Sequence, residues 1–185
     1  MAFIGSSRSL PEIIHNKPDC FTILMDNPNI SSPDDCLFCR KEIVEKSFSQ
    51  SLNFKAIYNI APILPGHSLI IPKSHYTSLF ELPDTEIAEM TVFAKKITSV
   101  LKTFFQCDGF DWTIQDGVSA GQTVLHLHLH IIPRKPLDLP EGNEWYSKIP
   151  ENEEKLLDSQ HRERLNNHEY IAITAKLAQA AGSIP

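Results

Sequence analysis

The sequence predicts an α+β domain built on an antiparallel sheet. Apolar runs at 54–59 and 67–72 flank a bend marked by Pro65 and Gly66, a pattern typical of a β-hairpin. From residue 83 onward, apolar side chains recur at helical spacing as far as Cys107, and the run "TVLHLHLHII" at 123–132 alternates as a strand does. A hairpin, one long helix and a further pair of strands indicate mixed secondary structure.

The remaining segments complete this domain. Residues 1–34 are rich in Pro, Asn, Ser and Asp and are interpreted as an N-terminal extension, followed by the domain at 35–135. Asp84 or Thr85 is the expected N-cap of the long helix, "FDWTI" at 110–114 is a strand, and "QDGVSAGQ" is a loop. Residues 136–185 are expected to form an acidic loop and a C-terminal helix that Gly182 ends.

Composition limits the partners that this chain can have. The 185 residues, 42% of them hydrophobic, suit a single domain. No apolar stretch reaches the roughly 18 residues of a membrane helix, and no secretory signal is evident, so we expect no membrane partner and a cytoplasmic location, with the nucleus left open. The net charge of −6 argues against a general nucleic-acid surface, so any phosphate recognition must be local.

Three histidines stand at alternate positions of the last predicted strand. Side chains alternate across a strand, so His126, His128 and His130 are expected on one face at intervals of roughly 6.6 Å. A solvated strand face would not explain why these residues are histidines. A catalytic metal site would need a further His or carboxylate, and no H-E-x-x-H motif is present. The third interpretation is histidine as a nucleophile toward phosphorus.

The loop before this strand favours phosphoryl chemistry. Gly117 and Gly121 would let backbone N–H groups approach an anion closely. Gln115, Gln122 and Thr123 add neutral donors, which can stabilise charge on phosphate oxygens without a basic surface.

With these residues in view, the chain resembles the histidine triad (HIT) superfamily, whose hallmark is His-φ-His-φ-His-φ-φ, where φ is apolar. "HLHLHII" fits this pattern at every position, and the resemblance covers roughly residues 36–135. "YNIAPILPGHSLIIPKSHY" looks like the substrate-side hairpin of the family, and "QDGVSAGQTV" is similar to its Fhit branch. The chain differs from that branch at 118–121, where Pro-Glu-Ala-Gly is common, and in carrying "CLFCRKE".

The resemblance implies a homodimer of chains with a five-stranded antiparallel sheet and a helix, and it implies binding of purine nucleotides. His128 would be the nucleophile that attacks the α-phosphorus. The positions expected to contact the substrate also have purely structural explanations, as turn, core or loop-capping residues. The implied substrate contacts are His130, Gln115 and Thr123 at the phosphates, His67 behind the triad, Asn59 at the ribose and Ile57 at the base. Gln122 is a further expected substrate contact because of its place among the donors of the loop.

A cysteine pair suggests a metal site beside the triad. Cys36 and Cys39 have zinc-knuckle spacing, but two sulfurs do not complete a tetrahedral site. "DDCLFC" and "PKSHY" are similar to segments of zinc-binding HIT proteins, many of them bacterial, and of galactose-1-phosphate uridylyltransferases. This resemblance implies a structural zinc held by Cys36, Cys39, His75 and His126. The alternative is a free cysteine pair and a surface His75.

The Fhit-like loop and the triad together imply a nucleotidyl hydrolase. Its substrates would be dinucleoside polyphosphates such as diadenosine tri- or tetraphosphate, cleaved at the α-phosphate through a nucleotidyl-histidine intermediate with release of AMP. Two other enzymatic reactions are possible alternatives: hydrolysis of adenosine phosphoramidates, as in the Hint branch, and phosphorolysis. A different class of function is a nucleotide-binding signalling module with slow turnover.

Overall fold

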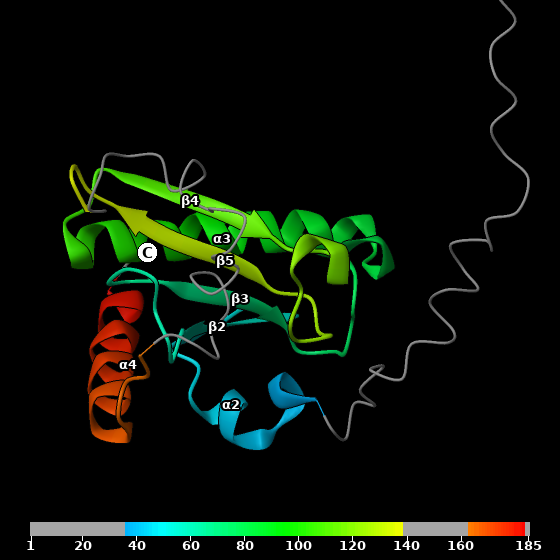
Figure 1. Ribbon diagram of the computed structural model, residues 1–185, viewed down its shortest axis with the longest axis horizontal. Helices are drawn as coiled ribbons and strands as arrows, with labels where there is room; N and C mark the ends of the chain where they lie inside the picture. Colours follow the sequence, from blue (N-terminus) through cyan, green and yellow to red (C-terminus); the bar gives the residue numbers. More distant parts are fainter. Residues whose placement is uncertain (1–35, 139–162, 184–185) are drawn as a thin grey trace, which may run out of the picture. The chain divides into compact units, whose positions relative to one another are not determined.

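The computed structural model describes residues 36–138 and 163–183, all within the unit Ser31–Pro185 (Figure 1). The predicted extension at 1–34 and most of the acidic loop lie outside these residues. The elements, in chain order, are η1 (Leu37–Cys39), α2 (Lys41–Glu45), β1 (Ser49–Gln50), β2 (Phe54–Tyr58), β3 (Ser68–Pro72), η2 (Leu79–Glu81), α3 (Asp84–Phe105), β4 (Gly109–Ile114), η3 (Val118–Ala120), β5 (Leu129–Arg134) and α4 (Asn167–Gly182). None of the described helices is both long and apolar enough to cross a bilayer.

The sheet has five strands in the order β1-β2-β3-β5-β4, and every neighbouring pair is antiparallel. The predicted hairpin forms as β2 and β3, with Phe54 opposite Pro72 and Tyr58 opposite Ser68. The last two strands pair over Gly109↔Arg134 to Ile114↔Leu129. The α+β class, the antiparallel pairing and the five-stranded sheet are therefore confirmed.

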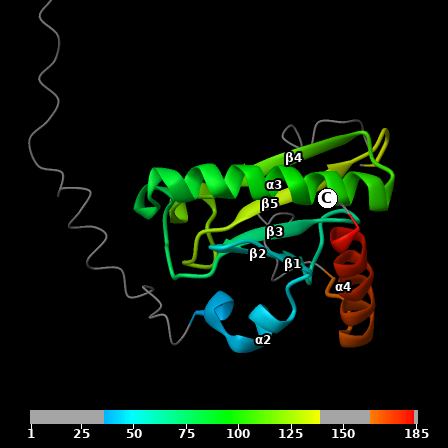
Figure 2. The same ribbon diagram turned by 180° about the vertical axis from the view of Figure 1, so that it is seen from behind.

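Alternation along β2 and β3 explains why both faces of the sheet are covered. Ala56 and Ile70 are fully buried in the main core, which also contains apolar residues of α3 and α4. Ile57 and Leu69 point to the opposite face and pack with Phe38 of η1. Figure 2 shows α3 lying along the first face. The second face, beside η1, is the one that carries the site.

The C-terminal helix packs on the same core. Leu177 is fully buried, and Tyr170 donates a hydrogen bond from its hydroxyl to the Tyr58 carbonyl at 3.1 Å. The helix begins at Asn167, where Asn166 and Glu169 form a reciprocal capping box. It ends at Gly182, as expected.

Two predicted features are wrong. The N-cap of α3 is Pro83 and makes no side-chain cap bond, so Asp84 already lies within the helix. The strand expected at 123–132 begins only at Leu129, because the preceding chain bonds elsewhere: the Leu127 N–H donates to the Tyr76 carbonyl at 2.6 Å. The residues before Leu129 are therefore held against a loop and not in the sheet ladder.

Candidate functional site

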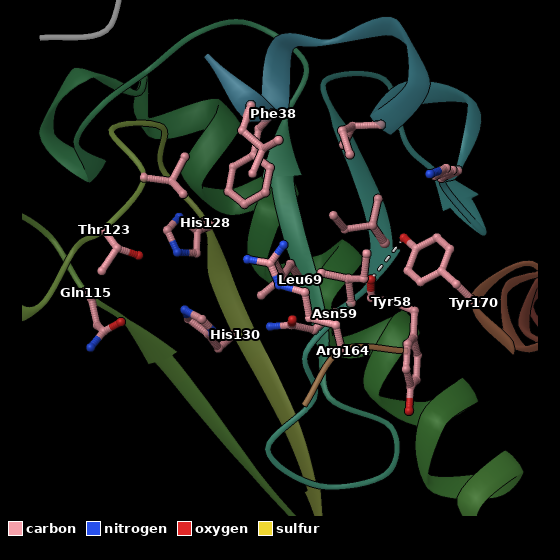
Figure 3. A pocket seen from close by; sticks show the side chains of 16 residues that line it. Phe38, Tyr58, Asn59, Leu69, Gln115, Thr123, His128, His130, Arg164 and Tyr170 are labelled. Atoms are coloured by element: carbon pink, nitrogen blue, oxygen red, sulfur yellow. Dashed lines mark hydrogen bonds between the residues drawn. The ribbon is translucent and has the colours of Figure 1, made fainter. Parts of the chain in front are cut away.

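A pocket opens on the second face of the sheet, between η1, the ends of β2 and β5 and the segment before α4 (Figure 3). Its volume is about 210 Å³. One wall is apolar and includes Phe38, Ile57 and Leu69. Beside it lie the polar side chains of His128, His130, Gln115 and Thr123 (Figure 3). An apolar slot beside polar donors is suited to a flat ring that carries a charged group.

Only His130 of the three histidines lies within a strand, yet the three remain on the side opposite Leu127 and Leu129. The two leucines belong to the main core, while the rings of His126 and His128 both contact Phe38 edge-on, with ring centroids at 5.9 and 5.3 Å. The expected separation of histidine and leucine sides therefore holds without a continuous ladder.

The ring of His128 is oriented by one hydrogen bond. Its Nδ1 lies 2.7 Å from the His126 carbonyl oxygen, which can only accept, so Nδ1 carries the proton and Nε2 has a free lone pair. The side chain is 6% exposed, and burial lowers its pKa below the ordinary value. His128 is thus a neutral imidazole at neutral pH, with its basic nitrogen available at the pocket.

A second histidine pair fixes the tautomer of His130. The Ile63 N–H donates to Nδ1 of His67 at 3.1 Å, so neutral His67 carries its proton on Nε2. That nitrogen lies 2.9 Å from Nδ1 of His130, which leaves the His130 proton on Nε2. His130 therefore presents a donor, the opposite polarity to His128. His67 itself is fully buried and lies against His130.

The other expected substrate residues divide into two groups. Asn59, Gln115, Thr123 and Ile57 all line the pocket. Gln122 does not line it, because its side-chain amide accepts from the Gly117 N–H at 2.8 Å and donates to the Thr77 carbonyl at 2.9 Å.

Gly121 has a separate role in this loop. A Cβ at this position would lie 2.7 Å from Nε2 of Gln115, so the glycine leaves room for that amide. The loop therefore offers the pocket Gln115 and Thr123, while Gln122 stabilises it from within.

A compact cluster of two cysteines and two histidines adjoins the pocket. The ligand atoms of Cys36, Cys39, His75 and His126 all lie within 4.8 Å of one another. Sulfur-to-nitrogen distances are 3.4 Å for Cys36–His126, 3.3 Å for Cys39–His75 and 3.5 Å for Cys39–His126. A tetrahedral zinc with ordinary Zn–S and Zn–N bonds would separate these atoms by about 3.6 Å. The cluster therefore fits a metal ion of that kind.

The protonation of the cluster also suits a metal. His126 donates from Nε2 to the Pro72 carbonyl at 3.1 Å, so its Nδ1 lone pair faces the sulfurs. Burial lowers the pKa of His126 to about 4, which keeps the ring neutral. Burial, followed by the bond to Cys36, raises the pKa of Cys39 to about 11. A metal would have to displace that proton.

The segment η1 links the cluster and the pocket. Cys36 is its N-cap and Cys39 is its last residue, while Phe38 between them forms part of the pocket wall. The buried Lys55 amine donates to the Phe38 carbonyl at 2.7 Å and fixes this turn from the sheet side. Sequence reasoning assigned no role to Phe38, although its place within the cysteine pair was a usable signal.

Several further pocket residues were not expected from the sequence, among them Leu69, Tyr170 and Arg164. Leu69 lies two positions beyond His67 on the predicted hairpin, so strand alternation offered a clue to it. Tyr170 and Arg164 come from the C-terminal region, and no local pattern brings that region to the pocket.

Comparisons with known proteins agree with this architecture. The HIT domain family matches residues 40–137. A bis(5'-adenosyl)-triphosphatase of Dictyostelium discoideum is 40% identical over 107 residues, 58% of this chain and 71% of that protein. An asymmetrical bis(5'-nucleosyl)-tetraphosphatase of Schizosaccharomyces pombe is 36% identical over 124 residues, 67% of this chain and 68% of that one.

One similar solved structure is relevant to the metal cluster. A zinc-bound histidine triad family protein from Mycobacterium smegmatis is 27% identical, with a TM-score of 0.58, over 82% of this chain and 99% of that one. The range matched by the family includes His75 and the three histidines but not Cys36, Cys39 or α4.

Proposed function

The chain belongs to the HIT family, and from this membership we propose that it is a nucleotidyl hydrolase that cleaves dinucleoside polyphosphates, such as diadenosine tri- or tetraphosphate, at the α-phosphate. Two relatives carry names of such hydrolases, at 40% and 36% identity. The observation that carries the proposal is the state of His128, which is neutral, buried and has a basic Nε2 at the pocket.

In the proposed reaction, the Nε2 lone pair of His128 attacks the α-phosphorus. A P–N bond forms while the P–O bond to the leaving nucleotide breaks, and that bonding pair stays on the leaving oxygen, which departs as an anion. The His126 carbonyl keeps its bond to Nδ1–H and so stabilises the positive ring of the nucleotidyl-histidine. Water then attacks the same phosphorus, the P–N bond breaks, AMP leaves, and the proton from water passes to solvent.

The other pocket residues support this chemistry by position. His130, with its proton on Nε2, would donate to oxygens of the α-phosphate, and its polarity is held by His67. Gln115 and Thr123 would donate from the same side of the pocket. Placing preorganised donors where charge develops stabilises the transition state more than the ground state.

The nucleoside would occupy the apolar side of the pocket. Ile57, Leu69 and Phe38 offer flat contacts for a purine. Asn59 would reach the ribose. Its side-chain oxygen already accepts from the Ala61 N–H at 2.9 Å, and its amide nitrogen lies 3.4 Å from Nε2 of His67. Asn59 is 7% exposed, so the residue is held in place before substrate binds.

The nucleophile is tested with His128→Ala and with His168→Ala, an exposed histidine on α4, as the matched control. We expect the first variant to lose cleavage of diadenosine tetraphosphate by at least a thousandfold and the second to retain it. In ¹⁸O-labelled water the label should enter AMP and not ATP. Wild-type turnover by His128→Ala would refute the mechanism.

The same assay separates the alternatives. A phosphate-dependent yield of ADP from diadenosine tetraphosphate would indicate phosphorolysis. Faster turnover of adenosine 5'-phosphoramidate would indicate the Hint-type reaction. Tight binding of diadenosine polyphosphates with negligible turnover of every substrate would favour a nucleotide-binding signalling module.

We further propose that the cysteine and histidine cluster holds a structural zinc. Two thiolates and two imidazoles make a closed shell, which leaves no position for substrate. The support is the sulfur-to-nitrogen spacing together with the zinc-bound relative. Metal analysis of protein purified without added zinc should give about one zinc per chain, and Cys39→Ser should lose it while Cys107→Ser, outside the cluster, retains it. Absence of metal from the wild-type protein would remove the proposal.

The family resemblance also leads us to propose a homodimer. Light scattering of the purified protein should give twice the chain mass of 20.9 kDa. A mass of one chain at micromolar concentration would contradict it.

A further inference from the structure

Arg164 is a cation at the pocket that no part of the proposed mechanism uses. It lies in the segment just before α4, and its exposed side chain lines the pocket. In Figure 3 this side chain extends across the pocket, and its guanidinium group points toward the side that holds His128. Arg164 therefore faces the nucleophile from the opposite wall.

The backbone beside Arg164 is fixed in this position. The Leu165 N–H donates to the Ile60 carbonyl at 2.9 Å, immediately after β2. Near the start of α4, the Tyr170 hydroxyl donates to the Tyr58 carbonyl at 3.1 Å. Two bonds to neighbouring carbonyls at the end of β2 therefore hold the base of the Arg164 side chain at the pocket.

The charge of Arg164 is not neutralised within the described part of the chain. The salt bridges among residues 36–138 and 163–183 involve Lys41 and Arg134 and not Arg164. None of the described residues that line the pocket carries a carboxylate, and Lys46 adds a second cation. In a chain of net charge −6, a pocket with two cations and no acid among its described lining indicates a polyanionic ligand.

The position of Arg164 matches the direction in which the leaving group would depart. In phosphoryl transfer the attacking and leaving atoms are roughly in line through phosphorus. If His128 attacks from its wall, the leaving group departs toward the opposite wall, where Arg164 is anchored. A guanidinium can hold phosphate oxygens through two parallel bonds.

We propose that Arg164 binds the phosphate chain of the leaving nucleotide and makes the site selective for polyphosphate leaving groups. This inference rests on the proposed function for its substrate and deepens it. It assigns the C-terminal segment a direct role in recognition, outside the range 40–137 that the HIT domain family covers.

The test compares two substrates that share the adenylyl group and differ in the leaving group. Diadenosine tetraphosphate releases ATP, which carries a triphosphate chain, whereas adenosine 5'-phosphoramidate releases ammonia. Arg164→Gln should lower kcat/KM for the first about ten- to a hundredfold and leave the second within about twofold. Arg164→Lys should retain part of the preference, and Lys176→Gln, an exposed cation on α4, should change neither.

Equilibrium binding keeps this test independent of turnover. In the His128→Ala background, Arg164→Gln should weaken binding of diadenosine tetraphosphate about ten- to a hundredfold but leave the affinity for AMP within about twofold. An equal loss for both ligands or both substrates would place Arg164 on the adenylyl half and overturn the inference, as would no loss at all. If Arg164→Gln selectively weakened binding of diadenosine tetraphosphate but the wild-type protein did not hydrolyse it, the proposed hydrolysis would be wrong and the contact between Arg164 and the phosphate chain would stand.

Discussion

Gly66 precedes His67 at a point where the chain has no room for a side chain. Its φ of +97° lies in the left-handed region, and a Cβ would lie 2.7 Å from Cγ of Pro133 and 2.9 Å from Cδ2 of Phe105. The Gly66 N–H also donates to the Tyr58 hydroxyl at 3.1 Å. Gly66→Ala must therefore either move a proline ring of β5 or shift the turn that holds His67.

The expected loss of stability in Gly66→Ala is the sum of the backbone strain and the overpacking. A left-handed conformation costs an L-residue about 1–2 kcal/mol, and overpacking of a filled site costs about 1–3 kcal/mol. A loss of about 3 kcal/mol in the free energy of unfolding would lower Tm by about 6–12 °C in a protein of this size. Because the shifted turn carries His67, which orients His130, kcat should fall as well.

Gly121→Ala is the matched control, since its φ of +88° is similar but its Cβ would meet only the end of the flexible Gln115 side chain. It should lower Tm by about 2–8 °C. The coupling energy between Gly66 and Pro133 comes from denaturant unfolding of Gly66→Ala, Pro133→Ala and their combination, and it should be about 1 kcal/mol in favour of the double variant. Equal losses for the two glycines, or zero coupling, would refute the close-packing argument.

Three other predictions follow from the core, the nucleophile and the C-terminal helix. Leu177→Ala should destabilise the protein by about 3–5 kcal/mol in denaturant unfolding, because the side chain is fully buried; a loss under 1 kcal/mol would contradict its place in the core. Burial lowers the pKa of His128 below 6.5, so the reactive neutral form persists on acidification and kcat/KM should decline only below that pH; half-activity at or above pH 6.5 would be inconsistent with this. Tyr170→Phe should cost about 1 kcal/mol by removing the bond to the Tyr58 carbonyl, and an unchanged Tm would show that water replaces it.

Local pattern was enough for the elements whose apolar spacing matches their burial. The hairpin, α3 and the β4–β5 pair follow directly from alternation and helical periodicity. The same alternation overextended β5, because "TVLHLHLHII" has strand periodicity throughout, whereas the ladder needs a partner that the chain before Leu129 does not have. The hydrogen bond from Leu127 to Tyr76 is a tertiary contact, which the local spacing of apolar residues cannot predict.

The site divides in the same way. The residues that line the pocket from the hairpin and the glycine loop could be found because they fall within recognisable motifs. Arg164 and Tyr170 could not, because they reach the pocket only through the docking of α4 on β2, a contact across more than a hundred positions of sequence. Phe38 lies between these cases, within a cysteine motif whose packing partner is distant in sequence.

The row of histidines is best understood from the protons on its rings. His126 donates a hydrogen bond from Nε2 to the Pro72 carbonyl and turns Nδ1 to the sulfurs. Its own carbonyl accepts a hydrogen bond from Nδ1 of His128, which leaves Nε2 of His128 available to the pocket. The same residue therefore faces the proposed metal with its ring and orients the proposed nucleophile with its backbone. A metal bound to the His126 ring would also immobilise the His126 carbonyl. Removal of the metal should therefore disturb the orientation of the His128 ring as well as the fold. Partial chelation should then lower kcat before the protein unfolds, whereas a site that served stability alone would lose both together.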